Sequence, residues 1–169
     1  TECPRHPAPG CRLGFGGATA GIKNYTGKFD PRDDRDRAEL IEAIRHAYSL
    51  GVNYFDTAPG YGDGASEAIY GEALSVIPPE GIFLATKANF APGQQIRASL
   101  EASLKRLQRD YIDLIQLHGT YYSQQDCELV FAKGGMLEAL EAAKAEGLVK
   151  HIGFSIECQN PPLYKLIEC

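Results

Sequence analysis

The sequence predicts an α/β protein built as a (β/α)8 TIM barrel, of which its 169 residues hold about the first five βα units. Two observations lead to this fold class. Short apolar runs alternate five times with segments of helical periodicity, which is typical of a parallel sheet joined by right-handed crossovers. The candidate strands also end on polar residues at a constant interval, since Lys87 follows Asp56 by 31 residues and His118 follows Lys87 by 31.

The expected strands are short runs rich in apolar side chains, each bounded by turn residues. In chain order they are residues 11–18, 52–56, 81–87, 112–118 and 149–155. The expected helices carry apolar residues at every third or fourth position, which gives each of them a buried stripe. They are residues 34–51, 66–77, 93–110 and 134–147, with another beginning within 161–168, and residues 19–34 and 119–133 are expected to be long loops.

A doubly wound nucleotide-binding sheet is the main competing architecture. It should show G-x-G-x-x-G directly after its first strand. Gly14 and Gly16 match the first two positions, but Thr19 occupies the third and no helical pattern follows at once. The barrel is therefore favoured, and because the carboxyl ends of its strands share one rim, Asp56, Lys87 and His118 are expected side by side there.

The length of the chain bears on how much of a barrel it can form. A (β/α)8 barrel typically takes about 250 residues, so we expect residues 1–169 to be an incomplete barrel domain of a longer protein, or a fragment needing a complementary chain. A five-unit sheet cannot close and leaves its edge strands unpaired. Its inner face is expected to carry Val52, Tyr54, Ile82, Leu84, Leu114 and Gln116.

Composition excludes several classes of function. A formal net charge of −5 and a pI near 5.4 argue against a nucleic-acid-binding surface. No apolar run is long enough to span a membrane, and the N-terminal residues lack the apolar stretch of a signal peptide. The five cysteines are irregularly spaced, which predicts neither a disulfide framework nor a metal site and fits a reducing, cytoplasmic setting. The oligomeric state cannot be predicted.

The three residues at the rim could act on a carbonyl group together with Tyr61, which lies in the Gly/Pro-rich turn five residues after Asp56. Lys87 beside Asp56 would remain charged, and its ammonium would stabilise the ionised form of Tyr61 and make that hydroxyl a better proton donor. His118 could donate a hydrogen bond to the same substrate oxygen. Since none of these groups can supply a hydride, a carbonyl-reducing site would need a reduced nicotinamide.

Four segments of the chain carry a resemblance to a known family: YFDTAPGYGDGASEAIYGEAL, ATK, ASLEASLKRLQRDYIDLIQLHG and AKAEGLVKHIGFS. Together they resemble the aldo-keto reductases over nearly the whole chain. The resemblance implies a (β/α)8 barrel that reduces aldehydes and ketones with NADPH and without a metal. It places the family's catalytic tetrad on Asp56, Tyr61, Lys87 and His118. It further implies that Tyr61 donates the proton and that Lys87 and Asp56 adjust the acidity of the Tyr61 hydroxyl. His118 would orient the carbonyl.

The resemblance also implies where the cofactor would bind. Family members commonly hold the nicotinamide carboxamide with Ser-Asn after the fifth strand, whereas this chain has Ser155 followed by Ile156. We expect Ser155 and Gly17 to contact the cofactor, with Gln159 or Asn160 in place of the missing asparagine. NADH is not excluded, because the family's adenosine-phosphate contacts come from later strands.

Other functions remain open at this stage. One is a non-catalytic, nicotinamide-binding barrel that acts as a regulatory subunit, and another is a lyase that uses Lys87 as a Schiff-base nucleophile. The segment 119–140 is also similar to a branch of the family whose members often carry a C-terminal iron–sulfur domain. The substrate is not identified, although Tyr25, Tyr121 and Tyr122 in the long loops suggest a partly aromatic pocket.

Overall fold

The computed structural model describes residues 13–119, 121–157, 164, 167 and 168. Five parallel strands form one sheet in the order β1-β2-β3-β4-β5, so the predicted strand–helix alternation is confirmed. Each strand pairs with the next one along the chain, as expected for successive βα units. The strands are β1 (Gly14–Gly16), β2 (Tyr54–Asp56), β3 (Phe83–Ala88), β4 (Ile112–His118) and β5 (Val149–Ser155).

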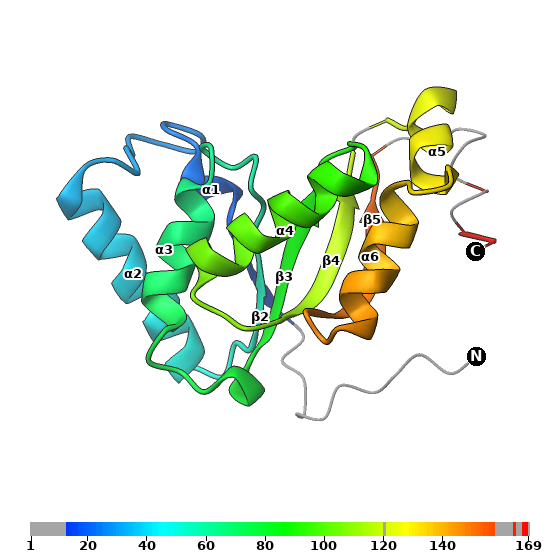
Figure 1. Ribbon diagram of the computed structural model, residues 1–169. Helices are drawn as coiled ribbons and strands as arrows, with labels where there is room; N and C mark the ends of the chain where they lie inside the picture. The colour runs from blue at the N-terminus through cyan, green and yellow to red at the C-terminus, as the bar shows by residue number, and fades with distance from the viewer. Residues whose placement is uncertain (1–12, 120, 158–163, 165–166, 169) are drawn as a thin grey trace.

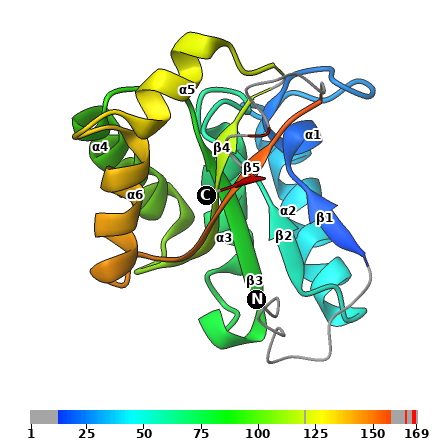
Figure 2. The ribbon, with the colours of Figure 1, turned by 90° about the vertical axis from the view of Figure 1, so that its right-hand side faces the viewer.

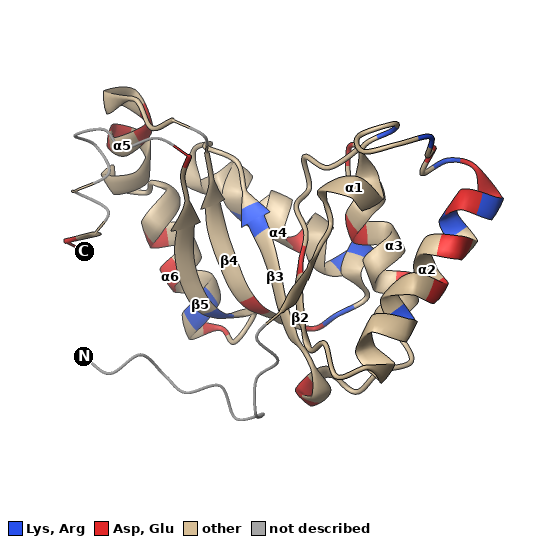
Figure 3. Cartoon of the chain, turned by 180° about the vertical axis from the view of Figure 1, so that it is seen from behind, with Lys and Arg blue, Asp and Glu red and all other residues tan. Residues whose placement is uncertain are grey.

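The main helices cover one face of this sheet and leave the opposite face open (Figures 1 and 3). The described helices are α1 (Ala18–Gly21), α2 (Asp34–Ser49), α3 (Ala65–Leu74), the 3-10 helix η1 (Pro79–Gly81), α4 (Gly93–Leu107), α5 (Gln124–Phe131) and α6 (Met136–Ala145). Turning the molecule by 90° shows β1 at one edge of the sheet, near α1 and α2, with α4, α5 and α6 on the other side of the view (Figure 2).

Local sequence signals explain where the helices begin and end. Asp33 caps α2, since its side chain accepts hydrogen bonds from the backbone N–H groups of Arg35 and Asp36. Gly51, at φ 95°, turns the chain out of that helix toward β2. The apolar stripe of α4 is buried as predicted, and its members are Ile96, Leu100, Leu104 and Leu107.

The two segments expected to be loops each contain a helix. Within 19–34, α1 forms one short turn. Within 119–133, α5 begins with a capping box, in which Ser123 and Asp126 each accept a hydrogen bond from the other's backbone N–H. That S-x-x-D pattern is a sequence-level helix start, so the assignment of 119–133 to a loop was wrong for a local reason.

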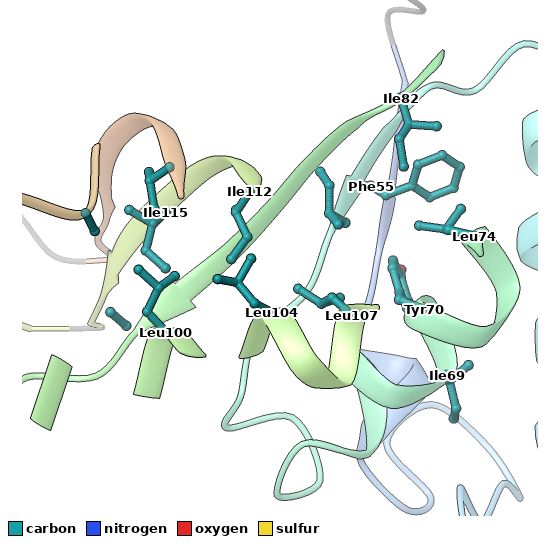
Figure 4. Close-up of a cluster of buried hydrophobic side chains, with 14 of the residues drawn as sticks. Phe55, Ile69, Tyr70, Leu74, Ile82, Leu100, Leu104, Leu107, Ile112 and Ile115 are labelled. Atoms are coloured by element: carbon teal, nitrogen blue, oxygen red, sulfur yellow. The ribbon is translucent and has the colours of Figure 1, made fainter. Parts of the chain in front are cut away.

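The hydrophobic core lies between the sheet and the helices (Figure 4). Phe55 packs edge-on against Tyr70 of α3, with ring centroids 6.3 Å apart, and so faces the helices. Leu84 is the register partner of Phe55 and faces the same way. The expectation that Leu84 and Ile82 line the inner face was therefore wrong: both are buried under the helices, and the strand's alternation turns Phe83 inward instead.

An ion pair with a buried carboxylate links α3 to α4 and to β3. Glu67 of α3 has no exposed surface, and its Oε1 accepts a 2.6 Å hydrogen bond from the Thr86 hydroxyl. Its Oε2 accepts from Arg106 of α4 at 2.7 Å. Gly71 lets the two helices come this close, because a Cβ there would lie 2.1 Å from the Arg106 carbonyl oxygen.

Removing the cation of this pair is expected to destabilise the protein strongly. Arg106→Met leaves the Glu67 carboxylate buried with one hydroxyl as its partner. Breaking a buried pair costs about 3–5 kcal/mol of the free energy of unfolding, and because Arg106 is 31% exposed, we expect a loss near the lower end of that range. Arg97→Met is the matched control, since Arg97 pairs with Glu101 and Glu146 at the surface and such pairs contribute about 0–1 kcal/mol. Urea unfolding monitored by circular dichroism measures both, and equal losses would contradict the assignment.

Charged residues are concentrated on the helical side of the molecule, on α2 in particular (Figure 3). In the part of the chain that the structure describes, none of the helices combines the length and apolar character needed to cross a membrane.

Candidate active site

The rim at the carboxyl ends of the strands carries the polar residues expected from the sequence, but in a staggered arrangement. Asp56 is paired with Ala85, so Lys87 lies two residues further along β3 than the partner of Asp56. Lys87 is in turn paired with Gln116, and His118 with Ser155. From β2 to β4, the polar residue of each strand therefore lies two residues nearer the carboxyl end than the register partner of the previous one. Strand tilt in a barrel requires such a displacement.

The Lys87 side chain extends from β3 toward the end of β2 and contacts Asp56 in spite of the two-residue offset between them. Its ammonium donates to Asp56 Oδ1 at 2.5 Å and to the Thr57 carbonyl oxygen at 2.8 Å. Lys87 is 6% exposed and Asp56 24%. Gln116 Nε2 donates to Asp56 Oδ2 at 3.1 Å, so both carboxylate oxygens are occupied. The ammonium is therefore fixed in one position.

Tyr61 lies in a tight loop after β2, and the backbone of this loop packs against the segment after β1. Gly62 has φ 66°, and a Cβ there would lie 1.8 Å from the Gly21 carbonyl oxygen. A Cβ on Gly21 would in turn lie 2.1 Å from the Tyr61 carbonyl oxygen. Because the two backbones touch, side chains are excluded at both positions, and the loop that carries Tyr61 is packed directly against the segment after β1.

The four residues predicted as a tetrad lie together. The Lys87 ammonium is 5.0 Å from the centroid of the Tyr61 ring. The rings of Tyr61 and His118 meet edge-on, with centroids 5.7 Å apart and an angle of 88° between their planes. Tyr61 therefore stands between the Lys87–Asp56 pair and the imidazole of His118.

His118 is half-buried at the end of β4. Burial lowers the pKa of its imidazole, and the nearby Lys87 ammonium lowers this pKa further, against the opposite effects of Asp56 and Glu157. His118 is therefore neutral at physiological pH. Its Nδ1 lies 3.2 Å from Oδ1 of Asn89, which follows β3.

Ser155 ends β5 on the same rim, beside His118. Its hydroxyl donates to the Leu117 carbonyl oxygen at 3.3 Å, which leaves the oxygen lone pairs free to accept. The single O–H of Tyr122 lies within hydrogen-bond distance of the carbonyl oxygens of both Leu117 and Ser155 and so links β4 to β5. Tyr122 is fully buried, and burial raises its pKa to about 12. The expectation that it lines an aromatic pocket was wrong, whereas Tyr25 and Tyr121 are exposed.

Of the remaining expected cofactor contacts, the structure describes Gly17. Gly17 is buried where the chain leaves β1, and a Cβ there would lie 2.6 Å from Ser66 Oγ and 2.9 Å from the Asp56 carbonyl oxygen. Its own carbonyl oxygen accepts from the Ser66 hydroxyl at 2.8 Å. Gln159 and Asn160 lie outside the described residues.

Sequence reasoning missed two contacts of this site. Gln116 was expected on the inner face without a role, although its position two residues before His118 on the same strand places it at the rim. The Thr57 carbonyl oxygen could not be found from side-chain types. Among the described residues, no group of three or more His, Cys, Asp or Glu side chains is arranged to hold a metal ion.

A parallel sheet that carries a tyrosine, a lysine–carboxylate pair and a histidine at its carboxyl edge has the layout of a (β/α)8 barrel, in which that edge carries the functional residues. In such an arrangement a tyrosine hydroxyl can act as an acid, an ammonium beside it can stabilise negative charge, and a histidine can form a hydrogen bond to a ligand. The fold and the position of these side chains therefore define the class of protein as a (β/α)8 barrel.

Comparison with known proteins identifies the family. A profile of the Aldo/keto reductase family matches residues 12–162. Probable aldo-keto reductase 1 of Glycine max is 35% identical over 156 residues, covering 85% of this chain and 41% of that protein. The NADH-specific methylglyoxal reductase of Escherichia coli is 33% identical over 141 residues, covering 71% of this chain and 42% of that protein. The crystal structure of an aldo-keto reductase from Klebsiella pneumoniae in complex with NADPH is 25% identical with a TM-score of 0.68, covering 90% of this chain and 48% of that one.

The chain belongs to the aldo-keto reductase family. Its five parallel strands match part of the (β/α)8 barrel of this family, which confirms the predicted fold class. The chain spans less than half the length of each relative named above.

Proposed function

We propose that the protein containing this chain reduces an aldehyde or ketone to an alcohol, reversibly, with NADPH as the hydride source and Tyr61 as the proton donor. The observation that carries this proposal is the position of Tyr61, between a fixed Lys87–Asp56 ion pair and a neutral His118. Asp56, Tyr61, Lys87 and His118 are the proposed catalytic residues.

Each side chain has a role in the proton transfer. The Tyr61 hydroxyl gives its proton to the carbonyl oxygen as negative charge develops there. The Lys87 ammonium stabilises the tyrosinate that remains, and Asp56 holds that ammonium in place through Oδ1. His118 contacts the same substrate oxygen and orients the carbonyl group.

The residues at the rim fit a nicotinamide ring. Gly16 pairs with Asp56, and a Cβ on Gly16 would meet nothing within 4 Å, so the inner face beside Asp56 is open. Ser155 offers an acceptor oxygen that suits the carboxamide NH2 of such a ring. A reduced nicotinamide bound there would supply the hydride for the carbonyl carbon. Gly17 and Gln159 remain proposed cofactor contacts.

The choice of NADPH is supported by the NADPH complex of the Klebsiella pneumoniae relative. NADH is the second candidate, because the Escherichia coli relative is named as NADH-specific. The full-length gene product assayed against a panel of aldehydes, ketones, aldoses and methylglyoxal, with each cofactor in turn, tests the proposal. We expect substrate-dependent oxidation of NADPH, and no turnover with any carbonyl and either cofactor would overturn the proposal.

Ser155→Ala is expected to weaken cofactor binding several-fold. The lost hydrogen bond is neutral and contributes about 0.5–1.5 kcal/mol. Fluorescence titration with NADPH measures the change, and Ser75→Ala is the matched control, since the Ser75 hydroxyl also donates to a backbone carbonyl oxygen but lies at the surface. Unchanged affinity in Ser155→Ala would move the carboxamide contact to Gln159 or Asn160.

The Schiff-base lyase is less well supported by the site. A lysine that attacks a carbonyl must first lose its proton, whereas the Lys87 ammonium donates to a carboxylate and to a backbone oxygen. Borohydride trapping with a carbonyl substrate separates the two functions, because a covalent adduct on Lys87 would favour the lyase. Cofactor binding without turnover would favour the regulatory subunit.

A further inference from the structure

A polar residue outside the tetrad contacts His118. Asn89 directly follows Ala88, the last residue of β3, and its side chain is exposed. The Asn89 Oδ1 atom lies 3.2 Å from Nδ1 of His118. The contact joins the ends of two neighbouring strands, and the other ring nitrogen, Nε2, remains for a ligand.

The partner at Nδ1 decides what Nε2 can do. A neutral imidazole carries a single N–H, so a hydrogen bond at one nitrogen determines the state of the other. If Asn89 accepts through Oδ1, the proton of His118 is on Nδ1, and Nε2 is a bare acceptor. If the amide is turned by half a rotation and Nδ2 donates, Nδ1 accepts and the proton is on Nε2. The two ends of an amide are nearly identical in shape, so both forms fit the same space.

The surroundings of His118 keep its imidazole neutral, so the tautomer decides whether Nε2 can donate a hydrogen bond. Burial lowers the pKa of His118 and so disfavours the imidazolium, and the Lys87 ammonium on β3 acts in the same direction. Asp56 on β2 and Glu157 after β5 favour the imidazolium, but their effects are smaller. Tyr61 contacts the ring edge-on. A neutral His118 therefore donates from Nε2 in one tautomer and cannot do so in the other.

We propose that Asn89 is a positioning residue that sets the tautomer of His118, donating from Nδ2 to Nδ1 and so placing the proton on Nε2. This inference rests on the proposed carbonyl reduction, in which a substrate oxygen needs a donor at Nε2. The orientation in the structure, with Oδ1 toward Nδ1, is converted to the donating one by a half-turn of the amide. Asn89 acts through His118 and does not touch the substrate.

The test is Asn89→Asp in the full-length protein, labelled with 15N at histidine. A carboxylate can only accept, so it should move the proton to Nδ1 and raise the pKa of His118. We expect long-range 1H–15N spectra at pH 8 to show the Nε2–H tautomer in the wild type and the Nδ1–H tautomer in the variant. Comparison with the His118→Gln variant assigns the His118 signal among those of the other histidines.

The pH dependence of kcat provides a second readout that a structural role would not move. At pH 8 the variant should lose about 10² in kcat, the usual effect of removing one donor to the substrate oxygen. Activity should return as the pH falls through the raised pKa of His118, because the imidazolium donates from both nitrogens. Asn53→Asp, at the opposite end of β2, is the charge-matched control and should match the wild type.

Two spectroscopic results would overturn the inference, and one kinetic result would do so as well. One is a wild-type His118 that carries its proton on Nδ1, and the other is an Asn89→Asp variant with an unchanged tautomer. A loss of kcat that is equal in Asn89→Leu and Asn89→Asp at every pH would indicate packing instead. The spectra need no turnover, so a failure of the proposed reduction is recognised separately, as absence of activity in the wild type.

Discussion

Tyr61→Phe is expected to lower kcat by about 10² or more, the scale of general acid catalysis. The variant removes the hydroxyl and keeps the ring, so the cation–π contact with Lys87 and the edge-on contact with His118 are preserved. The loop is held by the close backbone contact between Gly21 and Gly62, which the substitution does not alter. Steady-state kinetics with NADPH measures kcat, and fluorescence titration should show nearly unchanged cofactor affinity.

Tyr54→Phe is the matched control for this experiment. Tyr54 lies on the same inner face, at the amino end of β2, and its ring stacks on that of Phe83, with centroids 5.4 Å apart. The chemical change is the same, but it is made two residues before Asp56 on β2, in a ring that stacks on Phe83, so kcat should remain close to that of the wild type. Turnover of Tyr61→Phe at the wild-type rate would show that the proton comes from another group.

Lys87→Met is expected to reduce both activity and stability. The variant removes the ammonium that would stabilise a Tyr61 oxyanion, so we expect kcat to fall by about 10² or more. It also leaves the Asp56 carboxylate with Gln116 and partial solvent contact. Breaking a buried pair costs about 3–5 kcal/mol, and because Asp56 is 24% exposed, we expect a loss near the lower end of that range.

A second substitution separates the two effects. Asp56→Asn in the Lys87→Met background removes the unpaired charge, so the free energy of unfolding should recover in large part. Activity should not recover, since the ammonium is still missing. Urea unfolding and kcat are measured on the same samples, and a parallel recovery of both quantities would mean that Lys87 acts on activity through folding alone.

Much of the fold could be predicted from local pattern. The bounds of β4 and β5 are those expected, because each is a short apolar run between turn residues. The constant interval between Asp56, Lys87 and His118 also indicated a shared rim, since successive βα units return the chain to one edge of the sheet. The α5 helix could have been predicted as well from Ser123 and Asp126.

The sequence by itself determined which residue types stand at the strand ends, and the tertiary structure decided how they meet. Register depends on pairing between distant segments, so the two-residue stagger between Asp56 and Lys87 could not be read from their spacing. The Thr57 carbonyl oxygen as a partner of Lys87, and the burial of Tyr122 as a tie between β4 and β5, follow from the same cause. Periodicity is a local property of the chain, whereas these contacts exist only once the strands are side by side.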